Sequence, residues 1–502
     1  MGRGGRCFVG AINWTQVDVP DGRRSGHRSE DSNWKQGNEL DEMTTYHYND
    51  AAGTDRDYML LSAFFLLLPF IYAAQVLSGH PAVGLVGYVP LLLLSLAVMR
   101  YSKQYLNFYK ARPTFLGLLL LALVAHNAIS GIGALLQGNV ALGGRVLILF
   151  VLPFIVFVAG TRLSSERHWG IMRIVLFTAV AVAAELLWEN VSNWVLVRSS
   201  WFQLLNRDYV LGQTGKDLTQ LYVPAYRGTG LLEHVHVSTF YLAVGIVAGV
   251  TLYLKSGAKR YLIAAGFCEA VLVMHGVRLA LVAGIAATVL SLTLNFWNSR
   301  CGKRNRLKNS ALFLSLVFVL VLVTDPVGNT RRFYIPVVTN GVWNPDDADI
   351  TPSAIIGRGI KGMCNTVLSR LGSSDADDFQ DGLIGHGIVR SLSGDVVGLD
   401  DDFFVHQIFS QYGLLGGLVF FLIFLCSLLQ GLRATVRSAD ERGLLLAFSV
   451  SVILLSAIST LHSGVMQRKV PFALLFWVLA IICSCSAGRS TATNAADGVA
   501  RR

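Results

Sequence analysis

Charged side chains are scarce in this sequence. Only 15% of its 502 residues are charged, whereas 53% are hydrophobic, and the mean hydropathy is +0.51. A soluble domain needs more polar surface than this composition supplies. The scarcity of charge therefore excludes an ordinary soluble protein and predicts a membrane protein.

Signatures of several other protein classes are missing as well. Of the seven cysteines only Cys364 lies in a predicted outer loop, so no disulfide framework is expected. No cleavable signal peptide precedes the first apolar run, which begins near Tyr58. A P-loop, a Gly-x-Ser-x-Gly elbow and a dinucleotide-binding fingerprint are also missing from any suitable context.

The sequence has instead about twelve long apolar runs. A run needs about 20 residues to cross the hydrocarbon core of a bilayer. Because a bilayer has no water for stray backbone groups, each run is expected to be a helix. The predicted fold is therefore all-α, a polytopic membrane protein. The predicted spans are residues 58–77, 82–99, 115–135, 144–160, 171–190, 235–254, 259–274, 277–296, 309–324, 413–432, 443–461 and 470–486.

Basic residues follow the even-numbered spans. An excess of Lys and Arg marks cytoplasmic loops, so the amino terminus is predicted to be cytoplasmic and the functional face to lie on the opposite side. The net charge of +10 is then mostly a topology signal, and no nucleic-acid partner is expected. The residues that carry the pattern are Arg100, Lys103, Lys110, Arg112, Arg162, Arg167, Lys255, Lys259, Arg260, Arg300, Lys303, Arg304, Arg306, Lys308, Arg433, Arg437, Arg442, Arg489, Arg501 and Arg502.

Polar segments divide the chain around these spans. Met43 lies about 15 residues before the first span, and we expect it to be the native start. Between Ala354 and Gly372, apolar residues recur at helical spacing, which predicts an amphipathic helix on the membrane surface or a lid. A helix that only covers the ends of the spans is the alternative. The predicted organisation is a disordered cytoplasmic tail at 1–57, spans at 58–324 with an outer loop at 191–234, a long periplasmic loop at 325–412, spans at 413–486 and a cytoplasmic tail at 487–502.

Two arginines lie at the predicted outer ends of spans. Arg227 precedes the sixth span within Tyr-Arg-Gly-Thr-Gly, and Arg278 opens the eighth after His275-Gly276-Val277. An arginine at the start of an apolar run usually faces a cavity or a partner, and guanidinium binds phosphate bidentately. Together, with glycines beside them, they are predicted to hold a diphosphate. The alternative is that each reaches lipid phosphate or pairs with an acid such as Glu233.

A histidine lies at the same predicted face. His406 follows Asp400-Asp401-Asp402 and precedes the tenth span, where it could accept a proton near neutral pH. A structural histidine at a helix end is the alternative. His234, His236 and His275 suggest a zinc site as a further alternative. A His-x-His pair beside one more histidine is a weak pattern, however, and no metal is predicted.

Acidic residues within the spans keep a transporter interpretation open. Glu185 and Glu269 are predicted to lie deep in the membrane, and Glu189 near an outer end. Such acids form proton relays or pair with basic groups.

These motifs resemble the O-antigen ligase and polymerase family of bacterial envelope glycosyltransferases, over roughly spans 5 to 10. The family typically shows a histidine, a turn or two of helix and then Gly-Leu-Leu-Gly. It commonly has Ser and Asn where this chain has Val277 and Gln407. The resemblance rests on Arg227-Gly228-Thr229-Gly230, on Gly276-Val277-Arg278-Leu279-Ala280, on a long outer loop containing Gly385-His386-Gly387, on His406, and on Tyr412-Gly413-Leu414-Leu415-Gly416.

The resemblance implies a C-type membrane glycosyltransferase fold in the bacterial inner membrane, without metal or cofactor and with a periplasmic active site. The donor would be a glycan on undecaprenyl diphosphate. Arg227 and Arg278 would hold the diphosphate, His406 would take a proton from an acceptor sugar hydroxyl, and His386 and Arg390 would be further substrate-binding residues. The long loop would close over the glycans.

The acceptor stays open at this point. A ligase would use the lipid A core, a polymerase another lipid-linked glycan, and a related transferase a protein hydroxyl. A glycan-lipid flippase or other transporter is the alternative from another class. It predicts that Glu185 and Glu269 matter most and that a repeat relates the two halves, and the sequence shows no clear repeat.

Overall fold

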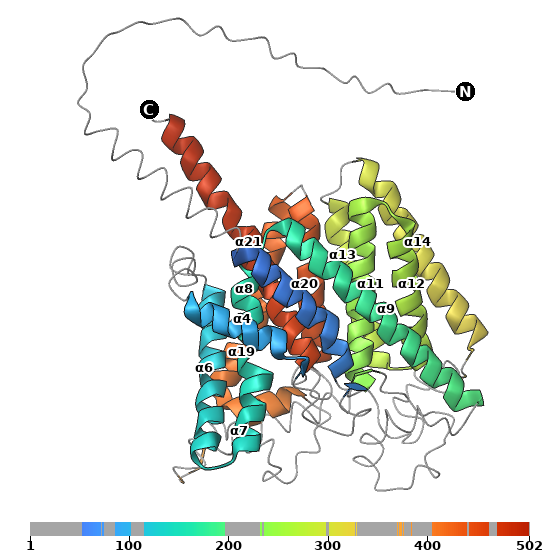
Figure 1. The fold of residues 1–502 in the computed structure, drawn as a ribbon. Helices are drawn as coiled ribbons and strands as arrows, with labels where there is room; N and C mark the ends of the chain where they lie inside the picture. The colour runs from blue at the N-terminus through green and yellow to red at the C-terminus, as the bar shows by residue number, and fades with distance from the viewer. Residues whose placement is uncertain are drawn as a thin grey trace, which may run out of the picture. The chain divides into compact units, whose positions relative to one another are not determined.

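A computed structural model describes most of the helical part of the chain (Figure 1). Predicted segments outside the described residues include most of the loops 191–234 and 325–412 and most of the predicted helix 354–372. The described residues are 53–71, 73–74, 86–101, 115–195, 231–232, 235–297, 301–326, 328, 404–438, 441–460 and 469–500, with single positions at 369, 371–373, 375 and 383.

Helices and turns make up the described residues, and no strand occurs among them. The predicted all-α class is thus confirmed for this part of the chain. Residues 53–67 form the first helix. The elements that follow are η1 (Leu68–Phe70), α4 (Val89–Arg100), α6 (Phe115–Leu136), α7 (Val140–Val146), η2 (Leu147–Val151), α8 (Phe154–Gly160), α9 (Ser165–Val195), α11 (Val235–Ser256), α12 (Lys259–His275), α13 (Arg278–Trp297), α14 (Cys301–Thr324), α19 (Phe404–Arg437), α20 (Glu441–Ser459) and α21 (Lys469–Ala500).

Seven of the described helices are long and apolar enough to cross a membrane, judged by length and composition. They are α6, α9, α11, α13, α14, α19 and α20. The predicted membrane character is supported by these helices, whereas the count of about twelve spans and the C-type fold stay predictions.

One predicted span is interrupted. The segment 144–160 consists of the end of α7, the π-helical turn η2 and the separate helix α8, which begins after Pro153. Proline lacks a backbone N–H and clashes with the preceding turn, and π-helical turns interrupt the regular hydrogen-bond ladder. Hydropathy alone does not register either feature.

Several boundaries also differ from the predicted ones. The first helix begins at residue 53, inside the predicted tail, and α9 continues to Val195, inside the first predicted outer loop. Helix α19 begins at Phe404, inside the second predicted loop. In each case the helix continues past the apolar run into residues of mixed polarity, which hydropathy does not assign to a span.

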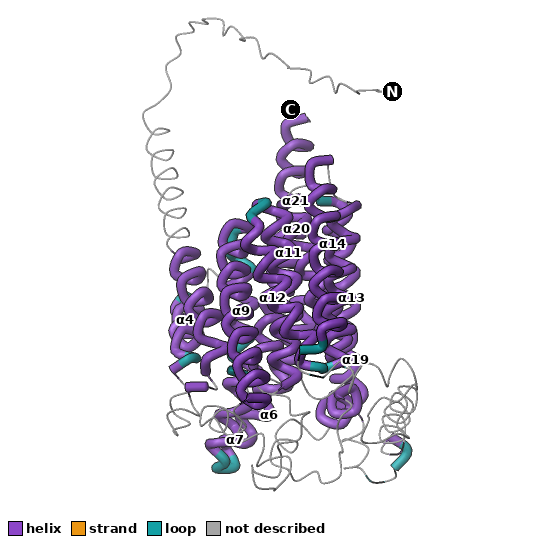
Figure 2. Tube along the Cα trace, turned by 90° about the vertical axis from the view of Figure 1, so that its right-hand side faces the viewer, coloured by secondary structure: helices purple, strands orange, loops and turns teal. Residues whose placement is uncertain are grey.

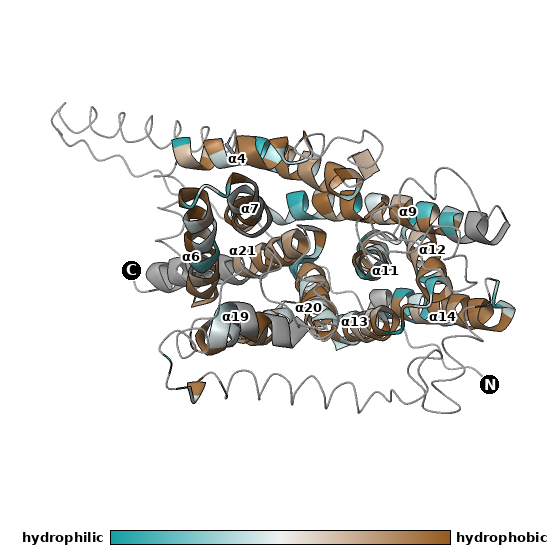
Figure 3. Cartoon of the chain, turned by 90° about the horizontal axis from the view of Figure 1, so that it is seen from below, coloured by the Kyte–Doolittle hydropathy of each residue, from teal (hydrophilic) through white to brown (hydrophobic). Residues whose placement is uncertain are grey.

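Helix α11 lies at the centre of its neighbours α9, α12, α13 and α20 (Figure 3). Its apolar window is entirely buried. Close approach depends on small residues: a Cβ added at Gly245 would lie 2.6 Å from the Cβ of Ala179, and one at Gly249 would lie 2.8 Å from the carbonyl oxygen of Tyr261. Small residues at such contacts let helix backbones pack tightly within a membrane.

Contacts between charged residues gather several helix ends at one end of the bundle, the upper end in Figures 1 and 2. Lys255, at the end of α11, lies 3.2 Å from Glu166 of α9 and 2.8 Å from Glu441 of α20. Arg306 of α14 donates to the carbonyls of Leu254 and Lys255. We call this end, which also contains Arg162, the basic end.

A buried ion pair ties the first helix to the same end. Arg162, after α8, donates to Asp57 over 3.2 Å, and their side chains are 4% and 0% exposed. Arg167 of α9 pairs with Asp55. The basic residues after several even-numbered predicted spans therefore meet at one end, as the charge pattern predicted. The side of the membrane that this end faces stays a prediction.

Candidate functional site

A layer of side chains near the basic end provides a reference for depth. Leu294 of α13 is buried against Ala447 and Val450 of α20, and Leu432 of α19 packs on the same cluster. Arg278 lies 16 residues before Leu294, which is about 24 Å along a helix, and Gly413 lies 19 residues before Leu432, about 28 Å. Arg278 and Gly413 are therefore at similar depth near the opposite end, which we call the motif end.

Arg278 is the first residue of α13, and a glycine turn places it there. Gly276 caps α12 in the left-handed conformation, with φ 76°, and its N–H donates to the carbonyl of Val273. A left-handed cap is a common way to end a helix, and glycine adopts it without strain. The preceding residue His275 is fully buried, whereas Arg278 is half-buried. The turn thus orders the guanidinium at the motif end.

Apolar side chains that follow Arg278 along α13, toward the basic end, are exposed on the same face of the helix. Val282, Ile285 and Val289 follow Arg278 at spacings of four, seven and eleven residues, which places them on one side of a helix. They are 58%, 40% and 55% exposed. Arg278 lies at the motif-end side of this exposed apolar stripe. A cation there could bind an anionic head group while the stripe contacts a long hydrocarbon tail.

Two histidines of neighbouring helices lie near the depth of Arg278. A Cβ at Gly284 of α13 would touch Ala243 of α11 and Leu272 of α12, so these three residues share a level. Arg278 is six residues, His236 seven and His275 three residues from that level, all toward the motif end. At 1.5 Å per residue these separations are about 9, 10 and 4–5 Å along the helix axes. Within the described residues, however, no three His, Cys, Asp or Glu side chains gather as a metal site.

Helix α19 bends sharply at Gly413. The backbone there has φ 64° and ψ −170°, a region open essentially to glycine. A Cβ at Gly417 would lie 2.7 Å from the ring of Phe409, although residues eight apart in a straight helix are about 12 Å apart. The segment ahead of Gly413 therefore turns across the helix end, and the Gly-Leu-Leu-Gly-Gly sequence is what allows this turn.

Helix α6 holds the bend from the other side. The rings of Tyr412 and His126 are 5.1 Å apart, and Asn127, the next residue of α6, is buried. In the sequence, His126 and Asn127 fall inside the predicted span 115–135. Two adjacent polar residues inside such a run are costly in lipid, and this signal would have revealed them.

The structure brings only part of the predicted site into view. Arg278 and the backbone of His406, in the first turn of α19, are both at the motif end. The side chain of His406, and the residues Arg227, His386 and Arg390, lie outside the described part of the chain. Their roles stay predictions.

The three acidic residues of the predicted spans lie on α9 and α12. Glu189 is fully buried and Glu269 is 9% exposed. One turn before Glu269, Gly266 packs against Phe313 and Val317 of α14. A carboxyl group near these apolar side chains is the feature that most favours a transport role.

Comparisons with protein-family models and with curated protein sequences find no match to this chain.

Proposed function

We propose that this protein is a glycosyltransferase that moves a glycan from undecaprenyl diphosphate to an acceptor sugar hydroxyl, in surface polysaccharide assembly at the bacterial inner membrane. The observation that carries the proposal is Arg278 at the top of the exposed apolar stripe Val282, Ile285 and Val289. This arrangement suits a diphosphate head with a polyprenyl tail lying along α13. The resemblance of the motifs to O-antigen ligases and polymerases supports the same chemistry.

The bend in α19 supports a role for His406. Without the bend at Gly413, His406 would lie seven residues, about 10 Å, beyond the level of Gly413. With the bend, Phe409 of the same segment folds back against Gly417, so this segment does not extend straight beyond that level. The ring contact of Tyr412 with His126 holds the bend against α6.

The proposed reaction is a displacement at the anomeric carbon of the donor. His406 takes the proton of the acceptor hydroxyl, whose oxygen attacks the anomeric carbon. The bond from that carbon to the diphosphate oxygen breaks, and undecaprenyl diphosphate leaves with the electron pair. Arg227 and Arg278 stabilise the negative charge that develops on it.

Single alanine substitutions test this mechanism. Arg227→Ala, Arg278→Ala and His406→Ala should each lower glycan transfer by roughly 10²-fold or more, measured in membranes with a lipid-linked glycan donor. Arg306→Ala, at the basic end, is the matched control and should retain transfer. Wild-type activity in all three variants would overturn the mechanism.

A deletion strain distinguishes the acceptors. Loss of long chains on lipid A, with accumulation of lipid-linked polymer, indicates a ligase, whereas a single-repeat product indicates a polymerase. Loss of glycan from a protein instead indicates a protein O-oligosaccharyltransferase.

A transporter is the second candidate, favoured by the buried Glu269. If the protein carries a glycan lipid, Glu269→Gln should abolish the phenotype and Arg278→Ala should leave it. The transferase proposal predicts the reverse pattern for these two variants.

A further inference from the structure

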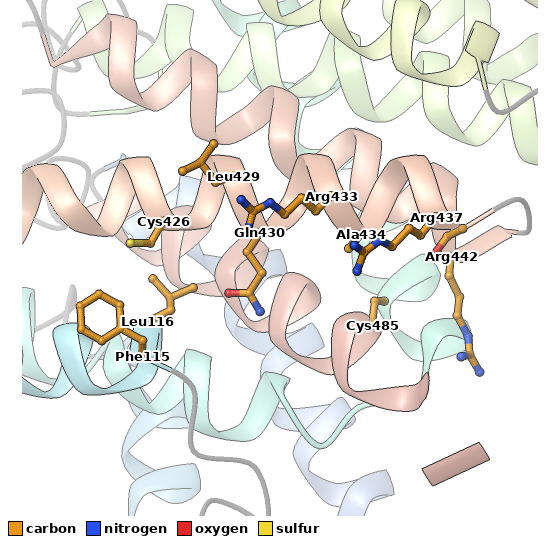
Figure 4. A pocket seen from close by; sticks show the side chains of 11 residues that line it. Phe115, Leu116, Cys426, Leu429, Gln430, Arg433, Ala434, Arg437, Arg442 and Cys485 are labelled. Atoms are coloured by element: carbon orange, nitrogen blue, oxygen red, sulfur yellow. The ribbon is translucent and has the colours of Figure 1, made fainter. Parts of the chain in front are cut away.

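A cavity lies at the basic end, away from the proposed site. Its volume is about 540 Å³, and it opens between α6, α19, α20 and α21 (Figure 4). This volume is within the range of small-ligand pockets, about 300–1,000 Å³. The lining residues that matter for its chemistry are Phe115 and Leu116 of α6, Leu429, Arg433 and Arg437 of α19, and Arg442 of α20.

One part of the cavity is cationic. Arg433 and Arg437 are four residues apart on α19 and so lie on one side of it, and Arg442 comes from the first turn of α20. Figure 4 shows Gln430, Arg433 and Arg437 along the same helix. None of the described residues that line the cavity is acidic. The lining therefore attracts an anion.

The other part is apolar and lies deeper. Cys426 is eleven residues before Arg437, which corresponds to about 16 Å along α19. Phe115 and Leu116 of α6 and Leu429 of α19 line this part. Phe115 is 61% and Leu429 is 45% exposed, so the apolar part is open at its side. A free inorganic anion would leave this apolar part empty.

We propose that this cavity binds one anionic phospholipid of the leaflet at the basic end. Its head group lies in the part of the cavity lined by Arg433, Arg437 and Arg442, and the first part of an acyl chain lies against Phe115 and Leu429. Basic pockets between membrane helices on the cytoplasmic side bind anionic lipid head groups in this way. The proposal does not depend on the glycan reaction.

Native mass spectrometry of the purified full-length protein tests it, with phosphatidylglycerol as the probe and phosphatidylcholine as the zwitterionic control. In the triple variant Arg433→Gln, Arg437→Gln, Arg442→Gln, the amount of bound phosphatidylglycerol should fall about fivefold or more relative to the wild type. The matched control removes the same charge at the same end, outside the cavity, by Lys259→Gln, Arg260→Gln and Arg304→Gln. It should retain wild-type binding.

Additional measurements distinguish specific lipid binding from misfolding and from binding of free phosphate. If the triple variant is misfolded by size-exclusion chromatography, Arg433→Gln alone is tested, with at least a twofold loss expected. Millimolar inorganic phosphate should not displace the lipid. Equal binding of phosphatidylglycerol by wild type, variant and control would overturn the proposal, as would displacement by phosphate with no preference for phosphatidylglycerol over phosphatidylcholine. Because the measurement reports bound lipid and not glycan transfer, a failure of the lipid-binding proposal is distinct from a failure of the glycosyltransferase proposal.

Discussion

The two ends of the helical bundle are organised by different means. At the basic end, side chains cross between helices: Asp57 pairs with Arg162, and Lys255 pairs with Glu166 and Glu441. At the motif end, backbone conformation at Gly276 and Gly413 determines where Arg278 and the first turn of α19 lie. Ion pairs between helices therefore hold one end together, whereas two backbone turns position Arg278 and the start of α19 at the other.

The largest expected effect concerns the buried ion pair of the basic end. Asp57→Ala removes the buried carboxylate that pairs with Arg162, and removing one member of a buried pair costs about 3–5 kcal/mol. The thermal midpoint in detergent should fall strongly, while the protein that remains folded keeps its transfer activity. Asp55→Ala is the control, because Asp55 is 70% exposed in its pair with Arg167. Equal destabilisation by both variants would contradict the assignment.

The next effect concerns the bend in α19. Gly413→Ala forces alanine into a conformation that costs about 1–3 kcal/mol. Because the bend also positions His406, we expect transfer to fall more than stability explains. Gly133→Ala in α6 is the control, since a Cβ there meets nothing within 4 Å. Wild-type transfer by folded Gly413→Ala protein would break the proposed link between bend and activity.

A smaller effect is expected from alanine substitutions at the two ends of α12. Gly257 precedes α12 with φ 74°, and Gly276 follows it with φ 76°. Alanine at either position should cost about 1–2 kcal/mol of backbone strain. At Gly257 the added Cβ would also lie 2.9 Å from the Arg306 guanidinium, so the thermal midpoint should fall at least as far for Gly257→Ala as for Gly276→Ala. Only Gly276→Ala should also lower transfer, because it displaces Arg278. A loss of transfer in Gly257→Ala as well would remove the functional difference between the ends.

The smallest effect concerns the exposed pairs of Lys255. Glu166 and Glu441 are 75% and 53% exposed, so each pair is expected to contribute less than about 1 kcal/mol. Lys255→Gln should shift the thermal midpoint slightly, and the shift should shrink in high salt. A large shift that does not depend on salt would instead indicate that contact with the Trp169 ring, 4.5 Å away, dominates.

Sequence and structure agree best where a strong local signal exists. The apolar runs predicted the helices, and the alternation of basic loops predicted that Lys255 and Arg306 share one end. Agreement is poorest where geometry depends on a few backbone angles, as in the broken segment 144–160 and the early start of α19. The contact of Tyr412 with His126 was missed because no local pattern links residues so far apart in the chain.

The amino-acid sequence by itself predicted the all-helical class of the described residues, the long apolar helices typical of a membrane protein, and the residue types that we propose for phosphate binding and proton transfer. These properties follow from composition and periodicity, which are local. Only the tertiary structure decided that Arg278 stands above an exposed apolar stripe, that Gly413 turns the start of α19 near the same depth, and that three arginines of α19 and α20 line a cavity with Phe115 of α6. Those features depend on which helix faces pack together, and a hydropathy pattern does not specify that choice.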